Sequence, residues 1–214
     1  TINIQVKEVC LFMGALIELK NIGYSYHNLA GETGAIKDVS FQVEEGEFVA
    51  LVGPSGCGKS TLLSIIAGLL APETGTIVVN NPDGSLHYPR VGYMLQHDHL
   101  FEWRTIYQNV TLGLEIHHAL TKERTDYVKQ LLSDYGLESF QDKRPSELSG
   151  GMKQRCAIAQ AFSMDPPILL MDEPFGALDA VTRARLQDLV LKLWAQDNPK
   201  KTVFFVTHDV DEAM

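Results

Sequence analysis

The stretch GPSGCGKST, from Gly53 to Thr61, has the residue types and the spacing to bind a polyphosphate. It matches the pattern G-x-x-x-x-G-K-[ST] in full, in which the glycines let the backbone wrap around phosphate oxygens. Backbone N–H groups and the N-terminus of the following helix then point at these oxygens. Lys59 would reach the β- and γ-phosphates, and the hydroxyl of Ser60 is placed to bind Mg²⁺. The predicted contacts are Gly53, Pro54, Ser55, Gly56, Cys57, Gly58, Lys59, Ser60 and Thr61.

The segments on either side of this loop fit the same interpretation. The apolar run FVALV, from Phe48 to Val52, precedes it, and the helical pattern TLLSIIAGL follows it. A strand before and a helix after are the context that a phosphate loop requires, whereas an ordinary glycine turn would need neither. Cys57 lies inside the loop, either as a small residue that fits or as a thiol whose alkylation would block nucleotide binding.

Two acidic residues follow another apolar run, in PPILLMDEP. Asp172 and Glu173 therefore emerge at the carboxyl end of a buried strand, where ligand sites of open parallel sheets form. Asp172 can hold Mg²⁺ through water, and Glu173 is free to polarise an attacking water for phosphoryl transfer. The alternative is that these acids cap the next helix, but the phosphate loop in the same chain favours the catalytic role.

Two further polar residues end apolar strands in the same way. Gln96 follows VGYML, and His208 follows TVFFVT. A glutamine at this position can contact the metal or the attacking water, and a histidine can bridge to a γ-phosphate oxygen. Either one alone is more often an ordinary loop residue, but their common placement at one sheet edge favours a role in the site.

A second glycine run, LSGGMKQR, spans Leu148 to Arg155. The residues before it are polar, so it cannot be a second phosphate loop of the strand-preceded kind. It opens the helical pattern MKQRCAIAQAFSM, whose apolar face includes Ile158, Ala161 and Phe162. A hydroxyl and free N–H groups at a helix N-terminus can bind an anion, although the same residues could simply cap the helix. These groups belong to Ser149, Gly150 and Gly151.

The strands that must position these residues have an α/β pattern. Continuous apolar strands are buried on both faces, as in a mainly parallel sheet covered by helices. Stretches with turn residues and polar alternation, around Ile17–Lys20, Ser40–Val43 and Thr76–Val79, predict an antiparallel β layer beside it. The segments assigned to the parallel sheet are FVALV (48–52), VGYML (91–95), ILLM (168–171) and TVFFV (202–206).

A helical subdomain is predicted over about residues 97–163, because no buried strand pattern occurs from His97 to about Pro145. Within it, Thr121 can cap a helix that ends near Gly136. Residues 1–12 are predicted to be an N-terminal extension, since Met13 looks like a natural start, and residues 13–214 form the α/β domain. The predicted apolar face of the helix is Tyr127, Val128, Leu131, Leu132 and Tyr135.

Composition narrows the possible partners and compartment. The 214 residues carry 18 Lys and Arg against 27 Asp and Glu, a formal net charge of −9, so no nucleic-acid partner is expected. Cys10, Cys57 and Cys156 are odd in number and lack framework spacing, which indicates reduced thiols in a reducing compartment such as the cytosol. The longest apolar run, Val9 to Ile17, is far shorter than the roughly 20 residues of a spanning helix.

Taken in order, the phosphate loop, Gln96, LSGGMKQR, LLMDEP, GALD and His208 resemble the nucleotide-binding subunits of ABC transporters. The resemblance runs from about Met13 to the end of the chain and implies a P-loop NTPase fold. It makes Gly53–Thr61 the Walker A loop, Gln96 the Q-loop residue and His208 the switch histidine. It makes Asp172 and Glu173 the Walker B pair and Asp179 of GALD the D-loop aspartate. It implies that an aromatic residue shortly before the phosphate loop stacks on adenine, Tyr26 in the first place or Tyr24 as the alternative.

The same resemblance implies partners. GYMLQHDHLFEWRTIYQNVTLGLEI and Met152 look like importer ATPases of the nitrate, sulfonate and taurine type, with relatives for other small solutes much alike. Such a subunit would bind ATP and Mg²⁺ and work as a homodimer or with a second ABC ATPase subunit. It would lie peripherally on the cytoplasmic face of the membrane, with Trp103 to Thr105 near an integral membrane permease. An extracytoplasmic solute-binding protein would take part indirectly.

The chain departs from the family pattern in two places. Cys156 and Gln160 stand where the family usually has Val and Arg, outside the nucleotide contacts. The chain also stops just past His208, which suggests a truncated C-terminus. The transported solute cannot be read from this subunit.

Two other functions compete with transport. A mechanical switch on DNA or ribosomes would keep ATP, but the acidity and the WRT segment at 103–105 disfavour it. A regulator that binds nucleotide without turnover would not need Glu173. The histidines lack acids or cysteines at ligand spacing and are interpreted as exposed loop residues rather than a metal site. They are His97, His99, His117 and His118.

Overall fold

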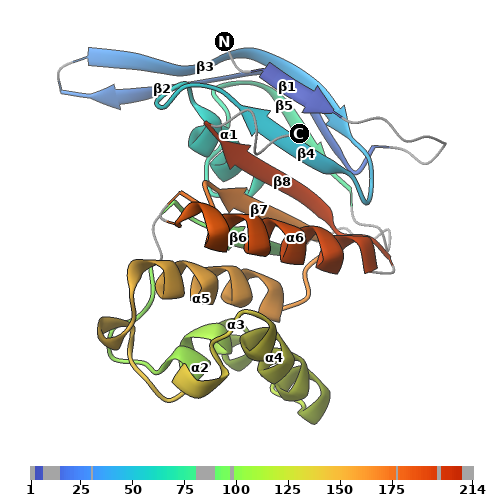
Figure 1. The fold of residues 1–214 in the computed structure, drawn as a ribbon. Coiled ribbons are helices and arrows are strands. Elements are labelled where there is room, and N and C mark those ends of the chain that lie inside the picture. The colour runs from blue at the N-terminus through green and yellow to red at the C-terminus, as the bar shows by residue number, and fades with distance from the viewer. Residues whose placement is uncertain are drawn as a thin grey trace.

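The computed structural model describes residues 3–6, 15–29, 31–80, 90–96, 99–176, 178–196 and 199–208. Met13, His97 and Ala177 lie outside these residues, so the predicted start and the predicted boundary at residue 97 are not described. The antiparallel layer lies on top of the view in Figure 1, the core sheet in the middle and most of the helices below.

The core sheet has five strands in the order β1-β4-β8-β7-β6. The pairs β4 with β8, β8 with β7 and β7 with β6 are all parallel, as the continuous apolar pattern predicts. β1 pairs antiparallel with β4 at the edge, within the segment predicted to be an extension. The strands are β1 (Asn3–Val6), β4 (Phe48–Val52), β6 (Val91–Met94), β7 (Ile168–Asp172) and β8 (Thr202–Thr207).

The second sheet is antiparallel, in the order β3-β2-β5. Its strands are β2 (Ile17–Asn28), β3 (Gly31–Val43) and β5 (Thr74–Val79), so the predicted antiparallel layer is confirmed. The predicted first two strands were too short. The missing parts form the outer half of the β2–β3 hairpin, where residues 31–34 are exposed and carry no apolar alternation to signal a strand.

The helices cover the core sheet on both sides (Figure 1). α1 (Lys59–Ile66) lies between the two sheets, whereas the other helices lie beyond the core sheet. In α4, Thr121 accepts a hydrogen bond from the Arg124 amide and Gly136 has φ of 65°, which confirms the predicted start and end. The others are α2 (Ile106–Val110), α3 (Leu112–Ile116), α4 (Lys122–Asp134), α5 (Gly150–Ser163) and α6 (Ala180–Gln196), with 3₁₀ turns at Glu138–Phe140 and Pro145–Glu147.

Alternation along the parallel strands creates two hydrophobic cores. In β7, Ile168 and Leu170 pack on the side of α1 and the antiparallel sheet, while Leu169 and Met171 pack on the side of α5. In β8, Phe204 and Phe205 divide in the same way. Each fully buried side chain of this size stabilises the fold by about 1.5–3 kcal/mol. The sheet is therefore fixed from both faces, which holds its carboxyl edge rigid.

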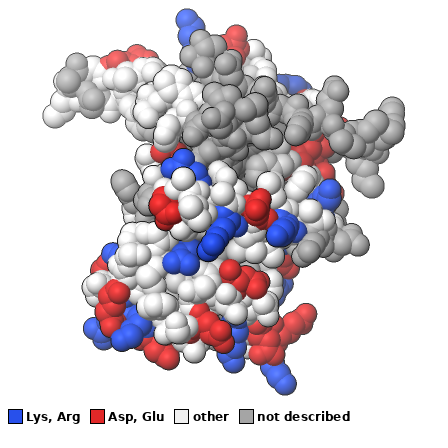
Figure 2. All heavy atoms as spheres, viewed as in Figure 1, with Lys and Arg blue, Asp and Glu red and all other residues white. Residues whose placement is uncertain are grey.

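The surface carries both signs of charge. On the face shown in Figure 2, Lys and Arg are interspersed with Asp and Glu over the helical half. Within the part of the chain that the structure describes, none of the helices combines the length and the apolar character needed to cross a membrane.

Candidate active site

The phosphate loop joins β4 to α1 and depends on Gly58. This residue has φ of 99°, and a Cβ there would come within 2.3 Å of the Ala35 carbonyl oxygen on β3. An L-residue is disfavoured at this φ, and the contact excludes any side chain. Gly58 is also the N-cap of α1 and makes no side-chain hydrogen bond to the first turn. The first N–H groups of α1 therefore remain available to an anion.

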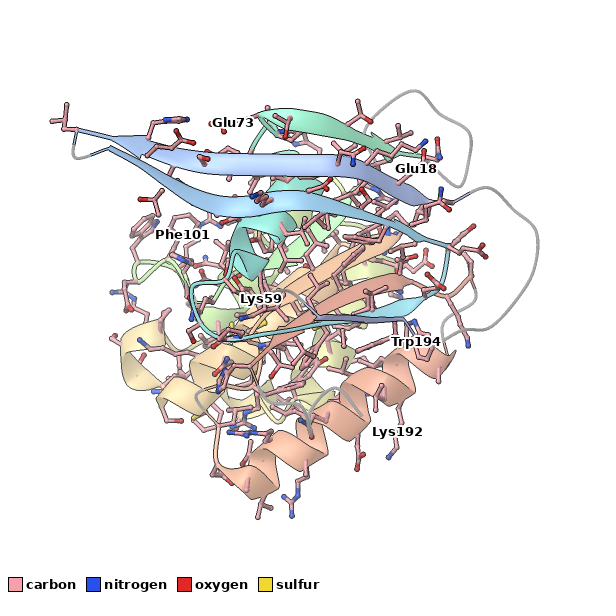
Figure 3. All side chains as sticks on the ribbon, turned by 90° about the horizontal axis from the view of Figure 1, so that it is seen from above. Glu18, Lys59, Glu73, Phe101, Lys192 and Trp194 are labelled. Carbon is pink, nitrogen blue, oxygen red and sulfur yellow. The ribbon has the colours of Figure 1, made fainter. Side chains whose placement is uncertain are left out.

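Lys59 is buried inside the loop that it serves. Its Nζ donates hydrogen bonds to the carbonyl oxygens of Gly53 at 2.7 Å and Pro54 at 2.9 Å, and it lies 3.9 Å from Cys57 Sγ. The residue is only 4% exposed, and Figure 3 shows it at the start of α1. A buried ammonium with only neutral partners in direct contact is costly, so an anionic phosphate would be a favourable ligand for it.

Asp172, at the end of β7, faces the start of α1. Burial raises the pKa of its carboxyl group, and the neighbouring Glu173 charge adds to this, while a hydrogen bond from the Ser60 side chain and the Lys59 charge act in the opposite direction. Ser60 and Asp172 thus offer two oxygen ligands at one point, the donor type that Mg²⁺ prefers. The fold thus brings together two residues that the sequence analysis named separately as possible Mg²⁺ ligands.

Glu173 has a constrained backbone. Its φ is 49°, in the left-handed region that a glutamate seldom adopts. Three hydrogen bonds hold it there: its N–H donates to the Val206 carbonyl, and its carbonyl accepts from the Gly176 N–H and the Gln154 side chain. Because this conformation costs about 1–3 kcal/mol, the surrounding contacts must fix the direction of the carboxylate.

The Glu173 carboxylate lies between two predicted site residues. Gln96 Nε2 is 3.5 Å from one carboxylate oxygen, and His208 Nδ1 is 3.5 Å from the other. These distances are at the long end of the hydrogen-bond range, so neither contact is tight. The two carboxylate oxygens therefore face the Gln96 amide and the His208 imidazole, at the edge of the core sheet where β6, β7 and β8 end.

The tyrosines on β2 lie beside the phosphate loop. The Tyr26 hydroxyl is 3.1 Å from Thr61 Oγ1 in the first turn of α1, and Tyr24 packs edge-on against Tyr26 with ring centroids 5.1 Å apart. Tyr26 is 46% exposed, so its ring is open to a ligand. Both residues remain candidates for stacking on a base.

The start of the second glycine run is a capped helix N-terminus. Ser149 is the N-cap of α5, where its side chain accepts a hydrogen bond from the Met152 amide. Gly150 is exposed, with open space around the position of a Cβ. α5 packs in the core on the opposite side of the sheet from α1 (Figure 1). The predicted anion contacts Ser149, Gly150 and Gly151 therefore lie at the start of a helix that packs on the other side of the core sheet from α1.

Asp179 contacts the start of α6. Its carboxylate accepts the Thr182 amide at 3.0 Å, and this hydrogen bond is the main cause that lowers its pKa. It therefore caps α6 and is exposed, so the structure shows a capping role for it. Gln154 is the contact that the sequence analysis did not single out, although it lies within LSGGMKQR. Only the folded chain brings its side chain to the Glu173 carbonyl, at 3.2 Å.

Comparison with known proteins decides the family. Residues 36–176 match the ABC transporter family. The chain is 44% identical over 186 residues to the taurine import ATP-binding protein TauB of Jannaschia sp., which covers 86% of this chain and 68% of that protein. The chain belongs to the ABC transporter family.

Two further comparisons support the branch and the fold of this ABC ATPase. It is 40% identical over 198 residues to the aliphatic sulfonates import ATP-binding protein SsuB of Bacillus thuringiensis subsp. konkukian, covering 92% of this chain and 77% of that protein. A dimeric, post-hydrolysis structure of the ATP-binding cassette MJ0796 with ADP and Pi superposes with a TM-score of 0.81, at 35% identity, over 92% of this chain and 90% of that one.

These matches confirm the predicted fold and the predicted importer branch. The protein is an ABC ATP-binding subunit that binds and hydrolyses ATP. The individual site residues of this ABC ATPase stay predictions, which the geometry above supports to different degrees. It brings together Lys59, Ser60, Asp172, Glu173, Gln96 and His208, with Tyr26 beside them, and gives Ser149 and Asp179 helix-capping contacts.

Proposed function

We propose that this ABC ATPase energises uptake of a small solute through a membrane permease, and that it works as a dimer with shared ATP sites. The solute class is that of nitrate, sulfonates or taurine, as in the relatives named for taurine and aliphatic sulfonate import. The observation that carries the hydrolytic part is the Glu173 carboxylate, held between Gln96 and His208.

Within one chain, each residue of the site has its own role in hydrolysis. Lys59 and the N–H groups of the loop bind the β- and γ-phosphates, and Tyr26 or Tyr24 stacks on adenine. Ser60 and Asp172, with the Gln96 side chain, would hold Mg²⁺, which neutralises charge on the phosphates when bound. Glu173 accepts a proton as a water oxygen attacks the γ-phosphorus, and the bond to the ADP oxygen breaks to give ADP and phosphate. His208 donates to a γ-phosphate oxygen.

The dimer follows from the separation of the two glycine runs. Ser149, Gly150 and Gly151 lie at the start of α5, on the other side of the core sheet from α1, so they are placed to complete the site of a second copy or of a similar subunit. In the MJ0796 cassette, a dimer is the state described with ADP and Pi. Closure of the dimer around ATP would pull the helical subdomains of the two subunits together, and hydrolysis would let the dimer reopen.

The substitution Glu173→Gln tests the shared site. It keeps the shape of the side chain but removes the proton acceptor, so we expect hydrolysis to fall by at least about 100-fold. ATP and Mg²⁺ should then trap a dimer, measured by size-exclusion chromatography with light scattering. The variant Glu138→Gln, at an exposed position in a 3₁₀ turn, is the control that should behave as the wild type. A Glu173→Gln chain that stays monomeric at saturating ATP would disprove the mechanism.

The membrane partner is proposed to contact an aromatic pair at the edge of the helical layer. Trp103 is 70% exposed, and its ring lies 4.8 Å from that of Phe101 between centroids. Exposed aromatic side chains of this kind are typical interface anchors. This ATPase subunit would lie on the cytoplasmic face of the membrane, and a solute-binding protein would deliver the solute from the other side.

This contact can be tested with the intact transporter. Trp103→Glu should abolish solute uptake and co-purification with the permease in detergent, while ATP binding by the isolated subunit stays unchanged. Leu191→Glu on α6, another exposed apolar position, is the control and should leave uptake intact. Normal uptake by Trp103→Glu would refute this placement of the permease.

A further inference from the structure

Three side chains converge on the antiparallel sheet, away from the parallel strand ends that form the ATP site. They are His27 of β2, Glu32 of β3 and Glu73, which precedes β5. One ligand atom from each lies within 4.8 Å of the others. Figure 3 shows Glu73 beside the start of β5, next to the hairpin. From this geometry we propose that the cluster binds a divalent transition-metal ion such as Zn²⁺, independently of the transport role.

Strand pairing fixes the three residues relative to one another. His27 and Glu32 are directly opposite in the register of β2 and β3. Glu73 is held by both carboxylate oxygens: Oε1 lies 2.6 Å from His27 Nε2, and Oε2 accepts the Ser25 amide at 3.1 Å. The cluster therefore rests on backbone pairing and on a carboxylate already oriented toward the imidazole, which lowers the entropy cost of closing around an ion.

Electrostatics favours a cation in this position. A hydrogen bond to the imidazole satisfies Glu73, but it leaves the Glu32 carboxylate close to a second carboxylate of the same sign. An ion between the two would turn this repulsion into attraction. On binding, His27 Nε2 would give its lone pair to the ion in place of the hydrogen bond to Glu73, with the imidazole proton on Nδ1.

The ligand types point to zinc rather than magnesium. Imidazole nitrogen with two carboxylates suits Zn²⁺ and its neighbours, whereas Mg²⁺ prefers oxygen ligands alone. Zn–ligand bonds of about 2.0–2.2 Å place tetrahedral ligand atoms about 3.5 Å apart, so small side-chain rotations suffice. Both carboxylates border a shallow hollow that Lys37 and Asp38 also line, which leaves room for water to complete the coordination.

A bound ion would join all three strands of the antiparallel sheet near its open end. His27 follows Tyr26, whose hydroxyl contacts Thr61. The bound ion would therefore also hold β2, the strand that carries this candidate adenine-stacking residue. The expected result is slower amide exchange in residues 23–36 when Zn²⁺ is present, because the hairpin opens less often.

Isothermal titration of the nucleotide-free protein with Zn²⁺ tests the site. We expect one saturable site per chain that millimolar Mg²⁺ does not displace. His27→Ala, Glu32→Gln and Glu73→Gln should each weaken binding by about tenfold or more. His117→Ala removes an equally exposed histidine of the helical layer and should bind as the wild type does. Circular dichroism verifies that each variant is folded.

Specific outcomes would overturn the assignment. Wild-type affinity in His27→Ala would exclude the imidazole as a ligand. Loss of binding in Cys57→Ser, with binding kept in His27→Ala, would place the ion at the phosphate loop instead. Equal slowing of amide exchange by Zn²⁺ in wild type and Glu73→Gln, over residues 23–36, would also refute the proposal. The proposed site requires the Glu73 carboxylate as a ligand.

Discussion

The two glycine-containing helix starts of this ABC ATPase differ in what satisfies their N–H groups. At α1, the N-cap is Gly58, which provides no side-chain hydrogen bond, and the buried Lys59 lies just inside. At α5, Ser149 caps the helix with its own hydroxyl and is exposed. Both starts offer an anion site in principle. Of the two, only the α1 start has a buried lysine, with the Asp172 carboxylate at the end of β7 close to it.

This difference assigns different tasks to the two glycine runs. The α1 start is ready to bind a polyphosphate within one chain, because its N–H groups await an acceptor. The α5 start is stable without a ligand, because its cap is already made. The phosphate of a nucleotide bound to a partner chain would only have to replace or share one weak hydrogen bond, that from the Met152 amide to Ser149 at 3.4 Å. Its role in hydrolysis is therefore conditional on a partner.

The largest expected effect comes from adding one methyl group to the phosphate loop. Gly58→Ala places a Cβ against the Ala35 carbonyl at an unfavourable φ of 99°, which costs about 3 kcal/mol or more in the loop that binds ATP. ATP affinity should fall by about 100-fold or more, as measured with a fluorescent ATP analogue. Gly150→Ala is the matched control, since a Cβ there meets open space. Equal affinities in the two variants would show that the loop tolerates a different shape.

The next expected effect, from the cap of α5, is on hydrolysis rather than on ATP affinity. Ser149→Ala should leave ATP affinity within about twofold, but lower hydrolysis by about 100-fold, if the hydroxyl binds the partner's nucleotide. The free energy of unfolding should also drop by about 1 kcal/mol from the lost cap. Steady-state phosphate release and denaturant titration measure the two effects separately.

Thr121→Ala separates capping from catalysis. Thr121 caps α4 in the same way, accepting the Arg124 amide at 3.3 Å, so its loss should destabilise the protein similarly and leave hydrolysis unchanged. If Thr121→Ala slowed hydrolysis as much as Ser149→Ala does, the catalytic effect would be one of helix stability alone.

The smallest expected effect is a pH-dependent change in stability without nucleotide. Because the folded pKa of Asp172 is raised above its ordinary 3.8, ionisation destabilises the fold as pH rises through the folded pKa. Asp172→Asn should therefore be more stable than wild type near neutral pH, by about 1 kcal/mol or 2–4 °C in Tm. The difference should close as pH falls below 3.8, where the residue is protonated in both states.

Asp179→Asn is the counterpart with the opposite sign. The Thr182 amide lowers the Asp179 pKa below 3.8, so the charged form stabilises the fold above that pH. The variant should be the less stable protein at neutral pH, and its deficit should vanish as pH falls through the lowered pKa. Thermal unfolding from pH 3 to pH 8 compares Asp172→Asn with Asp179→Asn. If the change in Tm at neutral pH had the same sign for both variants, the argument that burial raises the Asp172 pKa would be contradicted.

Much of the fold could be predicted because its signals are local. The strands FVALV and TVFFV, the helix that begins after Thr121 and the φ of Gly136 all follow from patterns within a few residues. The outer half of the β2–β3 hairpin escaped prediction because its residues are exposed and polar. Its existence depends on pairing between strands rather than on a buried face.

The sequence by itself determined the family and predicted the phosphate loop and the carboxylate pair Asp172 and Glu173, because each rests on short motifs whose chemistry depends on spacing along the chain. Only the tertiary structure decided which motifs share a site. It set Glu173 at φ of 49° between Gln96 and His208, put Ser149 beyond the core sheet, and brought His27, Glu32 and Glu73 together. Most of these contacts join residues far apart in the chain, and strand register and two-sided packing fix them rather than any local pattern.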